Sequence, residues 1–163
     1  MRVMIVRLVT AAVLVGAMLA TGSAAHAAGA ADPNAVAGAP VPQVTKVSVS
    51  ADAGALSFNY TCFGYTGTFK TGSTVMLVDW EDAGTGTDEC FGIAPNRTIW
   101  HAWPGSGGWK QMPNNGRADD TWAPYYSSDG RRGVSVYVSG SSSRWCSTRN
   151  FGPGWGAWFR CYL

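Results

Sequence analysis

The sequence has few of the features that usually reveal a catalytic protein. It contains two histidines, and only His101 lies beyond the first 30 residues. It has no Gly-x-Ser-x-Gly motif, which marks the nucleophile of many hydrolases, and no cysteines at the C-x-x-C spacing of many zinc sites. Any acid/base mechanism based on histidine must therefore use His101. A lone histidine is more often structural or partly exposed, so we predict no catalytic residue, no metal and no cofactor.

Charge is also sparse, and it does not favour either sign. The formal net charge of +2 disappears if Arg2 and Arg7 are removed, because ten basic residues then stand against ten acidic ones. Nucleic-acid-binding domains normally carry a basic surplus, so we expect no nucleic-acid partner. The charges are unevenly placed, however. Arginines dominate the C-terminal third, at Arg131, Arg132, Arg144, Arg149 and Arg160.

Long apolar runs are absent after residue 20. Leu8–Ala20 is uncharged and largely apolar, follows Arg2 and Arg7, and precedes a small-x-small site at residues 25–27. This is the anatomy of a secretory signal peptide, and the run is too short for a membrane-spanning helix of about 20 residues. We predict a signal peptide at 1–27, a flexible Ala/Gly/Pro-rich tether at 28–42 and one domain at 43–163. The expected product is extracellular, monomeric and free of the membrane.

Helical periodicity is absent as well. Apolar and polar residues instead alternate with a period of two, which is typical of half-buried β-strands. Leu56, Phe58, Tyr60 and Cys62 share one face of a predicted strand. Residues 52–54 predict a hairpin turn before this strand, and the apolar run 75–78 predicts a strand covered on both faces. The last predicted strand runs over residues 155–162. Seven to nine short strands predict an all-β fold, a small antiparallel sandwich or barrel.

Four cysteines in a secreted chain predict two disulfides, with three possible connectivities. We favour Cys62–Cys90 and Cys146–Cys161, because each pair is local and each second cysteine follows a plausible hairpin. The acidic stretch between residues 79 and 89 lacks the ligand spacing of an EF-hand. We interpret it as a solvated hairpin tip rather than as a calcium site.

Tryptophan is plentiful, with eight residues, all after Met76. If Cys161 points into the core, alternation along the last strand turns Trp155 and Phe159 inward with it. The other face of this region then presents an exposed aromatic row, which we predict to bind a ligand: Trp145, Trp158, Arg160 and Tyr162. Trp103 and Trp109 flank a glycine-rich turn and are predicted neighbours of this surface.

The segment Cys90-Phe91-Gly92-Ile93-Ala94-Pro95, followed by Thr98, resembles tendamistat-type secreted α-amylase inhibitors. The Arg160-Cys161 pair near the C-terminus is similar to the end of those proteins. The resemblance implies a β-sandwich with two sequential disulfides. The Trp-Arg-Tyr triplet of that family is absent, so the resemblance carries over no inhibitory residue.

Together these patterns predict a secreted, non-catalytic binding domain. The expected partner is an extracellular polysaccharide or a cell-wall glycan, bound through exposed aromatic side chains. The alternative is a proteinaceous inhibitor of an extracellular hydrolase, either an amylase or a protease. A third hypothesis is a small hydrolase that uses His101.

Overall fold

The computed structural model describes residues 41–49, 54–80, 86–151 and 154–162. The predicted signal peptide, residues 28–40 of the predicted tether and residues 81–85 of the acidic stretch lie outside these ranges. No helix long and apolar enough to cross a membrane is found among the described residues. The two disulfides are Cys62–Cys90 and Cys146–Cys161, which confirms the predicted pairing.

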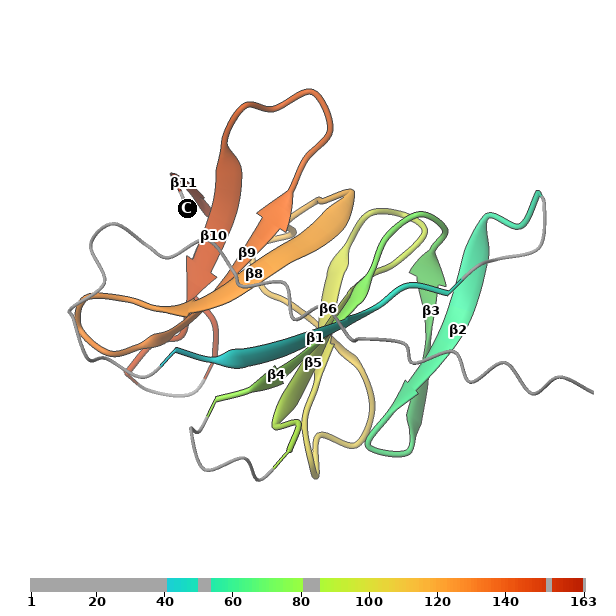
Figure 1. Ribbon diagram of the computed structural model, residues 1–163, viewed down its shortest axis with the longest axis horizontal. Coiled ribbons are helices and arrows are strands. Elements are labelled where there is room, and N and C mark those ends of the chain that lie inside the picture. Colours follow the sequence, from blue (N-terminus) through green and yellow to red (C-terminus); the bar gives the residue numbers. More distant parts are fainter. Residues whose placement is uncertain (1–40, 50–53, 81–85, 152–153, 163) are drawn as a thin grey trace, which may run out of the picture.

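The described residues form an all-β fold, as predicted, with eleven strands in three antiparallel sheets, more than the seven to nine strands expected. The five-stranded sheet has the order β1 (Gln43–Val47), β4 (Val75–Asp79), β5 (Glu89–Ile93), β6 (Ile99–Ala102) and β7 (Lys110–Gln111). The four-stranded sheet has the order β11 (Phe159–Cys161), β10 (Arg144–Thr148), β9 (Arg132–Tyr137) and β8 (Asp120–Tyr126). The third sheet is a hairpin of β2 (Ser57–Cys62) and β3 (Tyr65–Lys70) (Figure 1).

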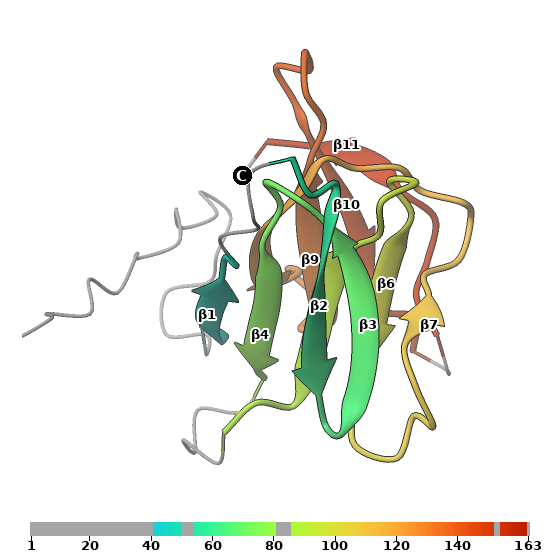
Figure 2. The same cartoon turned by 90° about the vertical axis from the view of Figure 1, so that its right-hand side faces the viewer.

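The sheets stack in three layers, with the five-stranded sheet in the middle. Figure 2 shows the β2–β3 hairpin in front of this sheet and the four-stranded sheet behind it. Alternation along β4 and β5 serves both interfaces. Met76, Val78 and Phe91 belong to the main core between the two larger sheets, whereas Val75 belongs to a second core beneath the hairpin. The prediction that residues 75–78 are covered on both faces is thus confirmed.

The predicted hairpin between the first two strands is wrong. β1 pairs with β4, so that Thr45 lies opposite Leu77, and β2 pairs with β3 instead. The turn between β2 and β3 consists of Phe63 and Gly64, which have φ angles of 53° and 80°. Two consecutive residues with positive φ match the twist of a tight antiparallel hairpin. The turn residues are Phe-Gly and not the Asn-Gly or Asp-Gly pair that usually indicates a hairpin, so little in the sequence indicates it.

The hairpin packs on the middle sheet through aromatic rings. Phe69 of β3 is buried and lies against Phe58 and Trp109, with its ring centroid 4.6 Å from that of Trp109. Its ring also covers Gly92 of β5, where a Cβ atom would lie only 2.4 Å from a ring carbon. Glycine at this position therefore allows the two layers to approach closely. The Cys62–Cys90 disulfide fixes the same interface covalently.

The edge strands of the two larger sheets are short or irregular. β7 has two residues and β11 has three. At the opposite edges, β1 carries Lys46, while β8 contains Pro124 and a bulge between Thr121 and Ala123. Lys46 Nζ donates a hydrogen bond to the Thr121 carbonyl oxygen at 3.1 Å.

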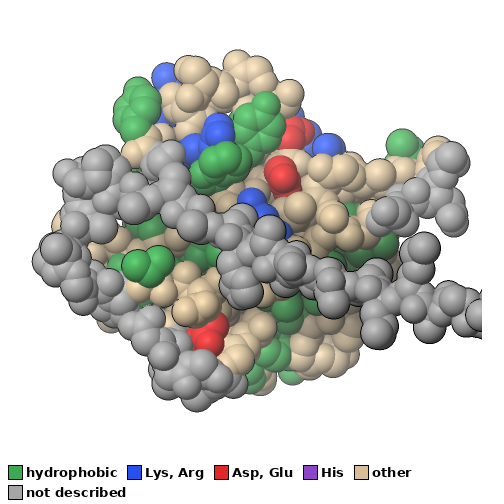
Figure 3. Space-filling model, viewed as in Figure 1, with side chains coloured by type: hydrophobic (Ala, Val, Ile, Leu, Met, Phe, Trp, Pro, Cys, Tyr) green, Lys and Arg blue, Asp and Glu red, His purple; other side chains and the backbone are tan. Residues whose placement is uncertain are grey.

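The bulge places Trp122 beside two cations. The Lys46 ammonium and the Arg144 guanidinium lie 5.4 and 3.8 Å from its ring centroid. Burial lowers the pKa of Lys46, and Arg144 adds to this effect, while Asp120 acts in the opposite direction. Figure 3 shows Lys and Arg side chains among apolar ones over strands β8–β10. Arg144, one of the C-terminal arginines, therefore has a structural role: together with Lys46 and Trp122 it packs β1 against the four-stranded sheet.

Candidate ligand-binding pocket

The last strand is shorter than predicted, and within it the two faces are reversed. Trp155, which precedes the strand, is buried in the main core as predicted. In β11, Arg160 lies opposite Trp145 of β10, and Phe159 lies opposite Cys146. Trp145 in turn lies opposite Val136, which is part of the main core. Directly opposite residues share a face of the sheet, so the β11 position of Arg160 is on the same side as Trp145, facing the core. Arg160 is nevertheless exposed, because β11 is the edge strand, and it also lines the groove described below. Phe159 shares the outer face with Cys146 and is 47% exposed, whereas the sequence predicted it to be inside.

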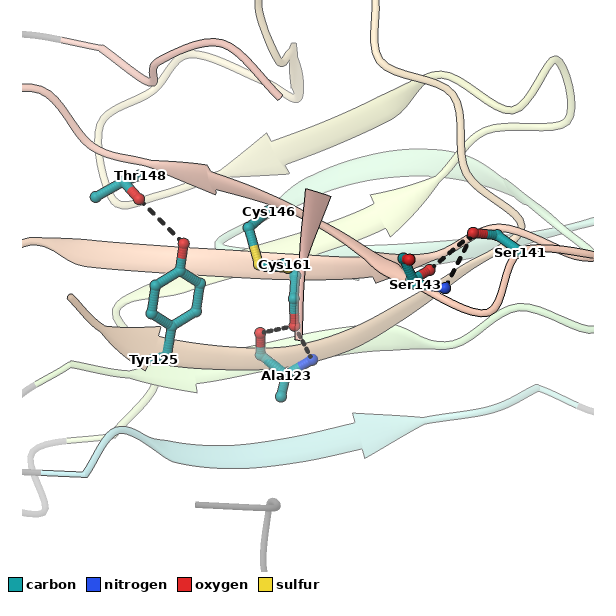
Figure 4. The surroundings of a disulfide bond; sticks show 8 residues. Ala123, Tyr125, Ser141, Ser143, Cys146, Thr148 and Cys161 are labelled. Atoms are coloured by element: carbon teal, nitrogen blue, oxygen red, sulfur yellow. Dashed lines mark hydrogen bonds between the residues drawn. A yellow bond between two sulfur atoms is a disulfide. The ribbon is translucent and has the colours of Figure 1, made fainter. Parts of the chain in front are cut away.

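The reason for the reversal is the position of the Cys146–Cys161 disulfide. It lies on the outer face of the four-stranded sheet and not in the main core, as Figure 4 shows together with Ala123, Tyr125 and Thr148. On the same face the Tyr125 and Thr148 hydroxyl groups are hydrogen-bonded at 3.0 Å. Because Cys161 points to the outer face, Phe159, two residues away, points to the outer face as well, and Arg160 between them starts from the opposite face.

The six residues predicted to bind a ligand therefore do not form a single aromatic row. Trp145 and Trp158 are half-buried against the main core, and Trp158 lies on Gly116. Trp109 packs on the hairpin, and its indole N–H donates to the Tyr65 carbonyl oxygen at 2.9 Å. The other three are more exposed but divide between two concave regions: Arg160 and Tyr162 line one, and Trp103 lines the other.

The first region is an open groove of about 600 Å³ on the outer face of the four-stranded sheet. Phe159 and Tyr162 line it, and Tyr162 is 81% exposed. Arg131 also lines the groove and stacks on exposed Phe151 at 4.9 Å. Of the aromatic residues in the predicted row, Tyr162 lines this groove, together with Phe159, which was predicted to be inside.

The second region is a pocket of about 510 Å³ between the two larger sheets. It lies where β6 and β10 end and β5 and β9 begin. Its lining comes from both sheets and from the segment before β11: Asp88, Glu89, His101, Trp103, Pro104, Arg132, Arg149, Gly154 and Trp155. Volumes of 300 to 1,000 Å³ are typical of small-ligand sites. The lining combines one exposed indole with fixed acidic and basic groups.

A hydrogen-bonded pair of Glu89 and His101 forms the buried side of this pocket. Phe91 lies opposite His101 in the β5–β6 register, and alternation places Glu89 on the same face. The Glu89 carboxylate accepts from His101 Nδ1 at 2.6 Å and from the Trp80 indole N–H at 3.0 Å. The side chains of Glu89 and His101 are 5% and 10% exposed.

This arrangement fixes the orientation of the imidazole. Because Glu89 binds Nδ1, Nε2 is the ring nitrogen left for a ligand of the pocket that His101 lines. The ring is held between Phe91 and Trp103, with centroid distances of 6.0 and 4.8 Å. Trp103 itself is 38% exposed and forms the outer wall of the pocket. His101 and Trp103, two residues apart in the chain, thus contact each other at the pocket.

Sequence reasoning missed the other polar residues of this pocket. Asp88, just before β5, accepts a hydrogen bond from the Trp80 backbone N–H at 2.8 Å. Arg132 lies with its guanidinium 5.4 Å from the centroid of the Trp80 ring. The available signal was Glu89, a carboxylate at the start of a strand whose other members are Cys, Phe, Gly and Ile. Such a carboxylate requires a buried partner.

The titratable groups in the described lining of the pocket are the Glu89–His101 pair, Asp88 and two arginines. Its described lining includes no serine, threonine or cysteine that His101 could activate. Within the described ranges, no group of three or more potential metal-ligating side chains is found. A comparison with protein-family models found no match, and comparisons with curated proteins and with solved structures found none either.

Proposed function

We propose that this protein is a secreted, non-catalytic domain that binds an extracellular polysaccharide or cell-wall glycan. The pocket beside Trp103 is the proposed binding site. Two disulfides are typical of extracellular proteins, and they support secretion together with the predicted signal peptide.

The observation that carries the proposal is the exposed Trp103 indole next to the fixed His101 imidazole. A sugar ring has an apolar face of C–H groups and an edge of hydroxyl groups. An indole provides a flat apolar surface for the face. Hydroxyl groups both donate and accept hydrogen bonds, so they suit a pocket that offers Asp88 as an acceptor and arginines as donors.

The test is binding of the purified protein to a panel of insoluble polysaccharides, with Trp103→Ala as the decisive variant. We expect binding to at least one polysaccharide, and a loss of affinity of about tenfold or more in the variant, because aromatic residues at binding hot spots contribute about 2 kcal/mol or more. Trp103 is at the surface, so folding should persist, which circular dichroism would verify.

Tyr162→Ala is the matched control, because it removes an exposed aromatic side chain from the outer groove instead of the pocket. It should bind as well as the wild-type protein. If Trp103→Ala binds the polysaccharide with wild-type affinity, or if only Tyr162→Ala loses affinity, the binding site is not the pocket beside Trp103. Failure of the wild-type protein to bind any member of the panel would refute glycan binding.

Inhibition of an extracellular hydrolase is the second candidate, and the outer groove favours it. Phe159 and Tyr162 expose aromatic surface there, and Arg160 also lines the groove. Aromatic and arginine side chains are enriched in protein–protein hot spots. The limited resemblance to tendamistat-type inhibitors also favours this role. The expected result is stoichiometric inhibition of an amylase or protease that Phe159→Ala weakens; no inhibition across a broad hydrolase panel would exclude it.

A further inference from the structure

Two arginines face each other at the mouth of the pocket. The Arg149 N–H donates to the Arg132 carbonyl oxygen at 2.8 Å, one position beyond the last β9–β10 pair, Thr148 and Gly133. Arg132 and Arg149 are therefore directly opposite each other on adjacent chain segments, and both line the pocket. Like charges directly opposite in a sheet are destabilising. The stability of the fold alone does not account for this placement.

No carboxylate compensates this pair by direct contact in the described part of the chain. The described ion pairs are Arg97–Asp119, His101–Glu89 and Arg131–Asp129, and none includes Arg132 or Arg149. The two acidic residues of the pocket have other partners. Asp88 accepts from the Trp80 backbone, and Glu89 accepts from His101 and from the Trp80 indole.

Each arginine has a feature that suits ligand binding. The stacking of Arg132 on Trp80 limits the motion of its guanidinium group. Arg149 is exposed, so it remains accessible from outside. A guanidinium group binds a carboxylate or a sulfate through paired N–H donors, and such charge-assisted bonds are about twice as strong as neutral ones.

We infer that Arg132 and Arg149 form an anion subsite, and that the ligand is an acidic glycan carrying a carboxylate or a sulfate ester. The inference rests on the proposed function, because it assumes that Trp103 and His101 hold a sugar in the same pocket. The acidic group binds the arginine pair while the sugar ring lies on Trp103. The shared chemistry is a planar or tetrahedral oxyanion on a sugar.

The test uses an oligosaccharide array in which each acidic glycan has a neutral counterpart. Uronate-bearing glycans are paired with their methyl esters, and sulfated glycans with their desulfated forms. We expect the wild-type protein to bind at least one acidic member at least about tenfold more tightly than its counterpart. Whether the preferred pair is a uronate or a sulfate identifies the oxyanion.

Arg149→Gln should abolish this preference while retaining weak binding to the neutral glycan, and Arg149→Lys should restore it in part, because lysine keeps the charge but lacks the paired donors. Arg117→Gln is the matched control: Arg117 is exposed and bridges to Thr98, at the other end of β6 from Trp103. It should retain the preference.

The outcomes separate this inference from the proposed function. Equal binding of acidic and neutral members by the wild-type protein overturns the anion subsite, while a loss in Trp103→Ala would still support glycan binding. An acid preference that survives Arg149→Gln also overturns it. If no member of the array and no polysaccharide of the panel binds, both proposals fail.

Discussion

The Cys62–Cys90 and Cys146–Cys161 disulfides differ in what they join and in the face that they occupy. Cys62–Cys90 connects two layers, the β2–β3 hairpin and the middle sheet, and both cysteines are buried. Cys146–Cys161 connects neighbouring strands of one sheet on its outer face. Cys146 and Cys161, by contrast, line the open groove. The period-2 pattern around a cysteine therefore shows which residues share its face of the strand, but it does not show whether that face is buried or exposed.

Removal of the disulfides should have the largest effect and should distinguish their roles. The closed loops span 28 and 15 residues, so the chain-entropy model gives losses of about 3.5 and about 3 kcal/mol in the free energy of unfolding. We expect Cys62→Ala/Cys90→Ala also to expose the β2–β3 hairpin to hydrogen exchange, which Cys146→Ala/Cys161→Ala should not do. Denaturant unfolding and exchange mass spectrometry measure both effects. Equal protection of the hairpin in the two variants would contradict the assigned roles.

Two glycines covered by aromatic rings provide a finer comparison of the same regions. A Cβ atom at Gly92 would lie 2.4 Å from the Phe69 ring, and one at Gly133 would lie 2.2 Å from the Tyr125 ring. Phe69 is fully buried between layers, whereas Tyr125 is only half-buried and lines the open groove. We expect Gly92→Ala to cost about 1 to 3 kcal/mol and Gly133→Ala to cost less. Thermal unfolding of the two variants checks this order, and a larger loss in Gly133→Ala would show that the outer face is the more rigid one.

The smallest expected effect concerns a polar contact between the larger sheets. Asp119 Oδ2 accepts from Arg97 Nη2 and from the Ser139 backbone N–H, both at 2.9 Å. Burial acts to raise the pKa of Asp119, but these two hydrogen bonds and the Arg97 charge outweigh it and hold the pKa below its ordinary value. The ionised carboxylate therefore stabilises the fold above pH ~4, and this contribution is lost as the pH falls through the lowered pKa.

Asp119→Asn should accordingly reduce the free energy of unfolding at pH 7 by about 1 kcal/mol or less, because the ion pair is partly exposed. The difference between variant and wild type should shrink as the pH is lowered below about 4. Denaturant unfolding at pH 7 and at pH 3 measures it. A constant difference across this range would mean that Asp119 acts through packing and not through its charge.

Local sequence patterns were sufficient to predict the fold class and the disulfides. Alternation in β2 correctly put Phe58 and Cys62 on one face, which is buried, whereas Leu56 of the same predicted face precedes the strand and is 85% exposed. The short spacing of the cysteines made local pairing the best hypothesis. The last strand was predicted wrongly for two physical reasons. Residues 156–158 are outside any strand, so alternation does not continue from Trp155 to Phe159, and the second disulfide lies on the outer face.

The pocket was only partly predictable, because non-local pairing assembles it. Trp103 was predicted to lie near a ligand-binding surface, and it contacts His101, the histidine singled out for possible acid/base chemistry. Their partners come from other strands: Glu89 from β5, and Arg132 from the second large sheet. No pattern along the chain indicates that β9 begins beside the end of β6. The ligand-binding roles of all these residues remain predictions.

The edges of the two larger sheets have a consequence for behaviour in concentrated solution. An exposed strand edge offers unpaired N–H and C=O groups to any other chain, and β-proteins suppress this hazard with short edges, charge, proline and bulges. Here each of the four edges has one such feature: β7 and β11 are very short, β1 carries Lys46, and β8 combines Pro124 with a bulge. Edge-to-edge association, the first step toward fibres in many β-proteins, thus has no long regular strand on which to begin at these edges.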